Sequence, residues 1–222
     1  MLKLLNKDRK IHKLPKLGMQ QDLRDVARKH SKDMAEKDYF DHVNLKRQTP
    51  KDRMQMSRVT EALSGENLAK IGGFVNPTQK AEIGLMNSPG HRANILNKHY
   101  NCVGIGVIQS VSKIYYFTQN FAKRYIIFKK RIPKKTRLKK GLKLKGYCTK
   151  EIPAIYYQLN KFKEVKKKKL IKLSEKNFEF IINFPEHGEY RVDIFVPDNP
   201  LKKNKFILSN HFEIYVKKGL FF

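Results

Sequence analysis

The sequence of 222 residues has no tryptophan, two cysteines, and 20 acidic residues against 48 lysines and arginines. Two cysteines cannot form a disulfide framework or a four-thiolate zinc site. No apolar run approaches the roughly 18 residues that span a bilayer. Residues 1–10 also lack the apolar stretch of a secretory signal. These absences favour an intracellular location, in the cytoplasm or on the cytoskeleton; the alternative is a secreted protein whose leader is missing.

Positive charge is the most conspicuous property of the chain. The formal net charge is +28, while 40% of residues are hydrophobic and 11% aromatic, which is enough for folded cores. The composition shifts near residue 128, where a basic segment without acids begins. We therefore expect a first domain over residues 1–127, a basic linker or exposed edge over 128–140, and a second domain over 141–222.

The first half reads as helices followed by strands. Apolar residues at three- and four-residue steps predict a helix over 23–35, and further helical segments are expected at 77–86 and 91–96. Two strands are then expected at 102–108 and 113–121. Helices first and an antiparallel pair last indicate an α+β fold.

The second half changes to strand periodicity. Apolar residues alternate over 178–184 and again over 190–196, with a turn at 185–188 between them, which predicts a hairpin. Further strands are expected at 142–145, 155–159 and 212–216. Several short strands over about 90 residues favour a small all-β sandwich of immunoglobulin-like type.

Four patches in the first half occur together in a characteristic order. Their order and spacing resemble the CAP superfamily, the cysteine-rich secretory, antigen 5 and pathogenesis-related-1 group whose module is also called the SCP domain. The likeness covers residues 1–127, is closest to the compact, cysteine-poor bacterial branch, and implies an α-β-α sandwich. The patches are His30–His42, Gly65–Ala69, Asn87–Leu96 and Tyr116–Phe121.

The resemblance also implies a cleft lined by histidines and acids, which binds a divalent metal in some members. Carried over by position, the site residues are His42, Glu66 and His91, while Ser88 stands where the family has a second acid. The family's helix tryptophan is replaced by Leu85. Some members bind lipids or sterols, so that ligand class stays open.

The chemistry of these side chains leaves three interpretations. Two imidazoles and a carboxylate give a zinc ion three ligands and an open position. The same groups can act as acid and base, since imidazole titrates near neutral pH. The third interpretation is structural: His42 and His91 satisfy polar groups by bonding Glu66 and the backbone. We favour the structural interpretation, assign no catalytic residue and no required cofactor, and keep a divalent metal such as zinc at His42, His91 and Glu66 as the next candidate.

Other polar and glycine residues have structural explanations. His30 lies one helical turn from Val26, so we expect it to pack in the core. Asn67 and Gln119 are expected to satisfy backbone groups. Gly104 and Gly106 alternate with β-branched residues and lack the third glycine of a phosphate loop, so they are expected to permit close packing of a strand.

The basic segments predict a polyanionic partner. Contact with a polyanion releases counterions and gives salt-sensitive association; the simpler alternative is a solvated surface. The candidate partners are an acidic protein assembly such as tubulin tails, nucleic acid, or an anionic membrane. The candidate contact residues are Lys129, Lys130, Arg131, Lys134, Lys135, Arg137, Lys139, Lys140, Lys166, Lys167, Lys168 and Lys169.

The leading functional hypothesis is therefore a non-catalytic scaffold protein that docks through this basic surface. The alternative is a metal-binding hydrolase, or a lipid- or sterol-binding protein, that uses the cleft around His42, Glu66 and His91. A second alternative is a secreted CAP protein with its leader trimmed.

Overall fold

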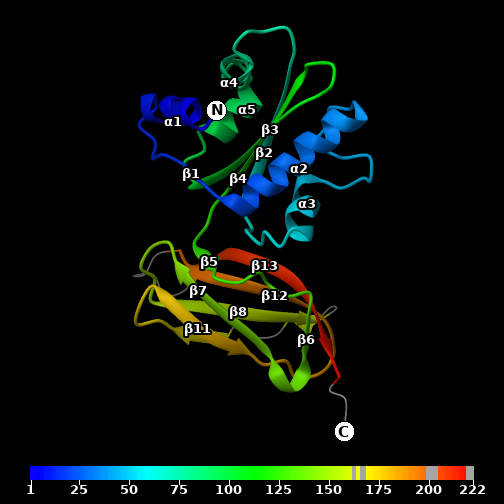
Figure 1. Ribbon diagram of the computed structural model, residues 1–222. Helices are drawn as coiled ribbons and strands as arrows, with labels where there is room; N and C mark the ends of the chain where they lie inside the picture. The colour runs from blue at the N-terminus through cyan, green and yellow to red at the C-terminus, as the bar shows by residue number, and fades with distance from the viewer. Residues whose placement is uncertain (162–163, 166–168, 199–204, 219–222) are drawn as a thin grey trace. The chain divides into compact units, whose positions relative to one another are not determined.

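The computed structural model describes residues 1–161, 164–165, 169–198 and 205–218 (Figure 1). The chain forms two compact units. Unit 1 contains Met1–Val59 and Leu63–Lys123, and unit 2 contains Thr60–Ala62 and Arg124–Phe222. Each unit is described by itself below.

Unit 1 is built on a four-stranded sheet with strand order β1-β3-β4-β2. Strand β4 is antiparallel to both β2 and β3, and β1 is parallel to β3. The elements are α1 (Leu2–Ile11), β1 (Gly18–Met19), α2 (Gln21–Lys37), α3 (Pro50–Met56), β2 (Ser64–Ile71), α4 (Pro77–Asn87), α5 (Pro89–Ile95), β3 (Cys102–Gln109) and β4 (Tyr115–Ala122).

The two faces of this sheet are covered by different helices (Figure 1). Alternate residues of a strand point to opposite faces. Cys102 therefore packs with Leu23 of α2, while Val103 packs with Leu5 of α1 and Leu85 of α4. The expected α-β-α arrangement of the CAP domain is confirmed.

Two glycines let α2 lie directly on β3. A Cβ atom at Gly104 would stand 2.1 Å from the carbonyl carbon of Leu23, and one at Gly106 would stand 2.4 Å from that of Ala27. No side chain fits in that space, so the predicted role of both glycines in close packing is confirmed.

Unit 2 is all-β in its described residues, apart from one short 3₁₀ turn. A curled six-stranded sheet has the order β10-β8-β12-β13-β6, with β9 paired to β8, and a three-stranded sheet has the order β11-β7-β5. The immunoglobulin-like assignment stays a prediction. The elements are β5 (Ile126–Phe128), β6 (Lys135–Arg137), η1 (Leu138–Lys140), β7 (Leu142–Cys148), β8 (Ala154–Lys161), β9 (Glu164–Val165), β10 (Lys169–Lys172), β11 (Asn177–Ile182), β12 (Gly188–Pro197) and β13 (Phe206–Lys217).

The predicted hairpin in this half is wrong. Strand β11 pairs with β7 in the small sheet, whereas β12 pairs with β8 and β13 in the large one. The turn at 185–188 thus connects two sheets. The apolar residues of both strands nevertheless lie in one core, as their alternation predicts: Phe178, Ile182, Val192 and Ile194. Alternation defines the buried face of a strand, and it does not define the neighbouring strand.

Residues 129–140 are an ordered part of unit 2, and we call them the basic strap. The strap begins after β5, which pairs with β7, and it contains β6, which pairs with β13 in the other sheet. Ile132 is 3% exposed and anchors the strap in the core. The strap therefore runs from one sheet to the other.

Candidate functional site

His42 lies on the loop between α2 and α3, and side chains of the loop itself determine its shape. Asp38 ends α2 in the left-handed conformation, with φ 47°. Asp41 Oδ1 accepts the backbone N–H of Val43 at 2.7 Å. Farther along, Asn44 Oδ1 accepts the N–H of Gln48 at 2.9 Å. These short-range hydrogen bonds bend the loop, and Tyr39 near its start packs against the core formed by Met34, Leu68 and Tyr116.

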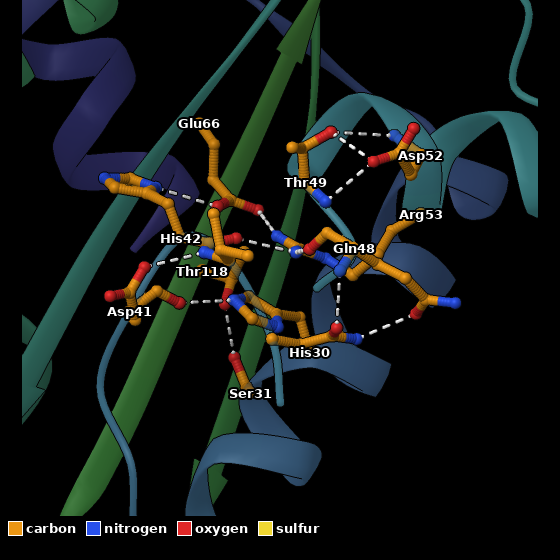
Figure 2. Close-up of polar contacts among 12 residues, drawn as sticks. His30, Ser31, Asp41, His42, Gln48, Thr49, Asp52, Arg53, Glu66 and Thr118 are labelled. Carbon is orange, nitrogen blue, oxygen red and sulfur yellow. Dashed lines mark hydrogen bonds and ion pairs between the residues drawn. The ribbon is translucent and has the colours of Figure 1, made fainter. Parts of the chain in front are cut away.

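Two buried side chains, from different helices, hold this loop (Figure 2). His30 Nε2 on α2 donates to the carbonyl oxygen of Asp41 at 3.0 Å. Arg53 Nη1 on α3 donates to the carbonyl oxygens of His42 at 2.7 Å and Gln48 at 2.8 Å. Consecutive carbonyl groups, of Asp41 and His42, are therefore fixed by different helices.

Glu66 connects this clamp to the His42 ring. It lies on β2 with a side chain that is 2% exposed. Its Oε1 accepts from His42 Nδ1 at 2.9 Å, and its Oε2 accepts from Arg53 Nη2 at 2.7 Å (Figure 2). With its amide oriented to satisfy its neighbours, Asn120 also donates to Oε2 at 3.0 Å. Because Nδ1 of His42 is bonded, Nε2 is the ring nitrogen left for a ligand, on a side chain that is half exposed.

His91 lies on α5 and is half buried. Its carbonyl oxygen accepts from Asn67 Nδ2 at 3.0 Å. The same Asn67 amide donates to Gln119 at 3.1 Å, and Gln119 donates to the buried carboxylate of Glu82 at 3.1 Å. A buried chain of amides thus supports the backbone that carries His91.

The two imidazoles are shifted in opposite directions. The hydrogen bond to Glu66 raises the pKa of His42 above its usual value. Burial lowers the pKa of His91, and the charge of His42 lowers it further. As pH rises, His91 therefore loses its proton before His42 does.

The site does not fit a three-ligand metal centre. Both oxygens of Glu66 are already bonded, one to His42 and one to Arg53. Within the described residues, no group of three or more His, Cys, Asp or Glu side chains is placed to hold a metal ion. We therefore derive no chemistry through a metal here.

The motif spacing predicts His42, Glu66 and His91 as site residues, but it does not predict the residues that position them. Arg53 lies outside the four patches. His30 packs in the core as expected, and it also donates a hydrogen bond to the loop. One signal was present: Thr49 and Asp52 have capping-box spacing, which starts a helix just before Arg53. A buried arginine one residue later requires a carboxylate partner.

The predicted polyanion-contact residues fall on unit 2. All eight cations of the basic strap are exposed, as is Lys169 at the start of β10. Lys166, Lys167 and Lys168 lie outside the described residues. Strands β6 and β10 are the two edge strands of the main path of the large sheet, so lysines there also discourage edge-to-edge pairing.

Comparison with known proteins identifies the family. Residues 2–121 match the Cysteine-rich secretory protein family, CAP, over more than half of the chain. The chain belongs to the CAP family. The match ends in the last strand of the unit 1 sheet, so the main part of unit 2, Arg124–Phe222, lies outside it.

Similar proteins occur in several bacteria. The uncharacterized membrane protein YlbC of Bacillus subtilis is 40% identical over 124 residues, which are 56% of this chain and 34% of YlbC. The uncharacterized protein YkwD of the same organism is 36% identical over 54% of this chain and 44% of its own length. The chain thus spans less than half the length of these curated relatives.

Two solved structures are also similar. An extracellular SCP-domain protein from Bacillus anthracis is 37% identical, with a TM-score of 0.48, over 55% of this chain and 39% of that one. An outer surface protein from Borrelia burgdorferi is 24% identical, with a TM-score of 0.50, over 55% of this chain and 89% of that one. The second likeness concerns the fold alone.

The likeness to YlbC overturns the expected intracellular location. That relative, 40% identical over 124 residues, is named a membrane protein. The expectation relied on the low cysteine count and on the lack of a signal-like apolar stretch. Unit 1, however, packs around its apolar cores with its cysteine, Cys102, free. Among the described residues, no helix combines the length and the apolarity needed to cross a bilayer.

Proposed function

We propose that unit 1 is a ligand-binding domain that binds a small anionic ligand at His42 and His91, without breaking a bond. The observation that carries this proposal is the 2.9 Å hydrogen bond between His42 Nδ1 and Glu66. It stabilises a protonated His42 and directs the remaining ring N–H away from the carboxylate.

The local charge balance favours an anion. Arg53 and Glu66 neutralise each other in their ion pair, so a protonated His42 adds a positive charge. Asp41 on the same loop offsets that charge only in part, because its carboxylate is exposed and screened by solvent. His91, neutral at the same pH, offers a ring nitrogen for a second hydrogen bond. The net charge of +28 attracts anions and opposes the approach of a divalent cation.

Bond-breaking chemistry receives less support. A pair of imidazoles with opposed pKa shifts does suit a general acid and a general base. However, the hydroxyl of Ser31 is buried against Thr118 at 2.9 Å, and both cysteines are buried away from solvent. Neither is available to act as a nucleophile on a bound substrate.

The test uses inorganic phosphate as the probe and imidazole NMR resonances as the readout. Phosphate is expected to shift the ring signals of both His42 and His91, and His42→Ala is expected to abolish the response at His91. Zinc is added to a second portion of the same sample as the competing ligand. Stoichiometric zinc binding that depends on both histidines would contradict an anion site. No response to phosphate would also contradict it.

A second candidate function concerns the basic strap in unit 2, which we propose as a docking surface for a polyanion. It carries eight cations and no acid over twelve residues, and all eight are exposed. The strap is thus a fixed row of charge, because Ile132 and the ladders of β5 and β6 hold it.

Binding to immobilised polyphosphate across a salt series tests the strap. Affinity is expected to fall steeply as salt rises, because each phosphate contact releases counterions. The variant Lys134→Glu/Arg137→Glu is expected to weaken binding, whereas the exposed control Lys32→Glu on α2 is expected to have a much smaller effect. Lys32→Glu changes the net charge by half as much as the double variant, so a loss of binding free energy half as large would mean that net charge alone is responsible.

A further inference from the structure

Two loops of unit 1 lie side by side at one end of its sheet (Figure 1). The first, residues 72–76, follows β2, and the second, residues 110–114, joins β3 to β4. Ile71 and Tyr115 are register partners, so the loops start from adjacent strands. A Cβ atom on Gly72 would stand 3.4 Å from Ile114 of the second loop.

The tips of both loops present apolar side chains to solvent. Val75 is 98% exposed, Val111 is fully exposed, and Phe74 is 51% exposed. Transfer of a valine side chain from water to an apolar environment is ordinarily favourable. Full exposure at neighbouring tips therefore indicates a surface that is buried in some other setting.

The backbone holds these side chains outward. Gly73 adopts a positive φ of 74°, which turns the chain just before Phe74 and Val75. In the second loop, the N–H of Ser110 donates to the carbonyl oxygen of Ile114 at 2.8 Å, and the N–H of Lys113 donates to that of Ser110 at 3.0 Å. Val111 sits at the tip of this closed turn.

Lysines border the apolar tips. Lys80 lies 4.9 Å from the centre of the Phe74 ring, and Lys113 is two residues after Val111. Asp38, an acid at this end of the sheet, forms an ion pair with Lys70 at 3.4 Å and accepts a hydrogen bond from the hydroxyl of Tyr116 at 3.0 Å. Apolar tips beside uncompensated lysines suit a surface that is apolar within and anionic outside.

We propose that this tip surface, made of Phe74, Val75, Val111, Lys80 and Lys113, inserts into the interfacial region of an anionic lipid bilayer. The valines and the phenylalanine enter between acyl chains, and the lysines stay at the level of the headgroups. A bilayer fits better than a protein partner because the apolar groups stand on two separate tips, and each can be buried singly. The inference is independent of the ligand proposed for His42 and His91.

The absence of tryptophan makes insertion directly measurable, because one introduced tryptophan is the sole indole fluorophore. Val75→Trp and Val111→Trp are prepared in the full chain, together with Ile11→Trp on α1 as an exposed control. Vesicles contain equal parts of phosphatidylcholine and phosphatidylglycerol. Emission from both tip tryptophans is expected to shift to shorter wavelength on addition of vesicles, and emission from the control is expected to stay unchanged.

A second measurement separates insertion from electrostatic attraction. Val75→Asp/Val111→Asp is expected to weaken vesicle co-sedimentation by about tenfold or more, with an unchanged free energy of unfolding because both sites are exposed. Lys134→Glu/Arg137→Glu in the basic strap is expected to retain the tip fluorescence shift. Binding that depends on the strap while the tip tryptophans stay in water would overturn the proposal, as would absence of vesicle binding.

Discussion

Arg53 Nη2 and Glu66 Oε2 lie 2.7 Å apart in an ion pair whose side chains are 8% and 2% exposed. The pair links α3 to β2, and through the second oxygen of Glu66 it determines the position of the His42 ring. Burial makes the two charges dependent on each other, because neither has water to replace its partner.

Replacement of Arg53 by methionine is expected to lower the free energy of unfolding by about 3 kcal/mol, because a buried carboxylate is left without its cation. The measurement is urea denaturation at neutral pH. Lys32→Ala breaks an exposed pair with Glu36 and is expected to cost less than about 1 kcal/mol. The double variant Arg53→Met/Glu66→Gln is expected to recover part of the lost free energy of unfolding. A small loss in Arg53→Met itself would show that the pair does not stabilise the fold.

Substitution of Gly104 by alanine is expected to destabilise unit 1 by at least about 1–3 kcal/mol, since the new methyl group would meet the backbone of α2. Gly84 on α4 is the matched control. A Cβ there has nothing within 4 Å, so Gly84→Ala is expected to stabilise the helix by about 0.5–1 kcal/mol. Thermal unfolding of the two variants should therefore shift in opposite directions. Similar shifts would show that α2 does not rest on β3 at the glycine.

Glu82 is expected to make stability depend on pH. Burial raises its pKa from 4.5 to about 7, so the folded state holds its proton more tightly than the unfolded state. The free energy of unfolding therefore falls as pH rises from 4.5 to about 7, by up to about 3 kcal/mol.

Glu82→Gln should stabilise the protein above pH 7 and have little effect below pH 4.5, as measured by denaturation at both ends of that range. The control Glu36→Gln, on an exposed side chain, should show no comparable gain. A gain of equal size at both pH values would assign the effect to packing and not to titration.

Local patterns in the sequence were sufficient for individual elements. The apolar spacing of Leu23, Val26 and Met34 predicted α2, and the alternation around Ile105 predicted β3. The partner strands of β11 and β12 could not be predicted in this way. Alternation of apolar residues indicates which face of a strand is buried, but it does not indicate which strand lies beside it.

The site shows the same division. Motif spacing selected His42, Glu66 and His91, but the contact between Arg53 and Glu66 depends on how α3 packs against β2. No local pattern in the sequence predicts that contact. Likewise, Val75 and Val111 are 36 positions apart in sequence, and their proximity arises from the pairing of β2 with β4.

The central claim is that Glu66 keeps one imidazole of the site protonated beside a neutral one. NMR titration of the His42 and His91 ring signals, in the native protein and in Glu66→Gln, tests it most directly. The account predicts a pKa above the usual value for His42 and below it for His91, with the His42 value falling in the variant. Two coincident pKa values, or a His42 pKa unchanged by Glu66→Gln, would contradict it.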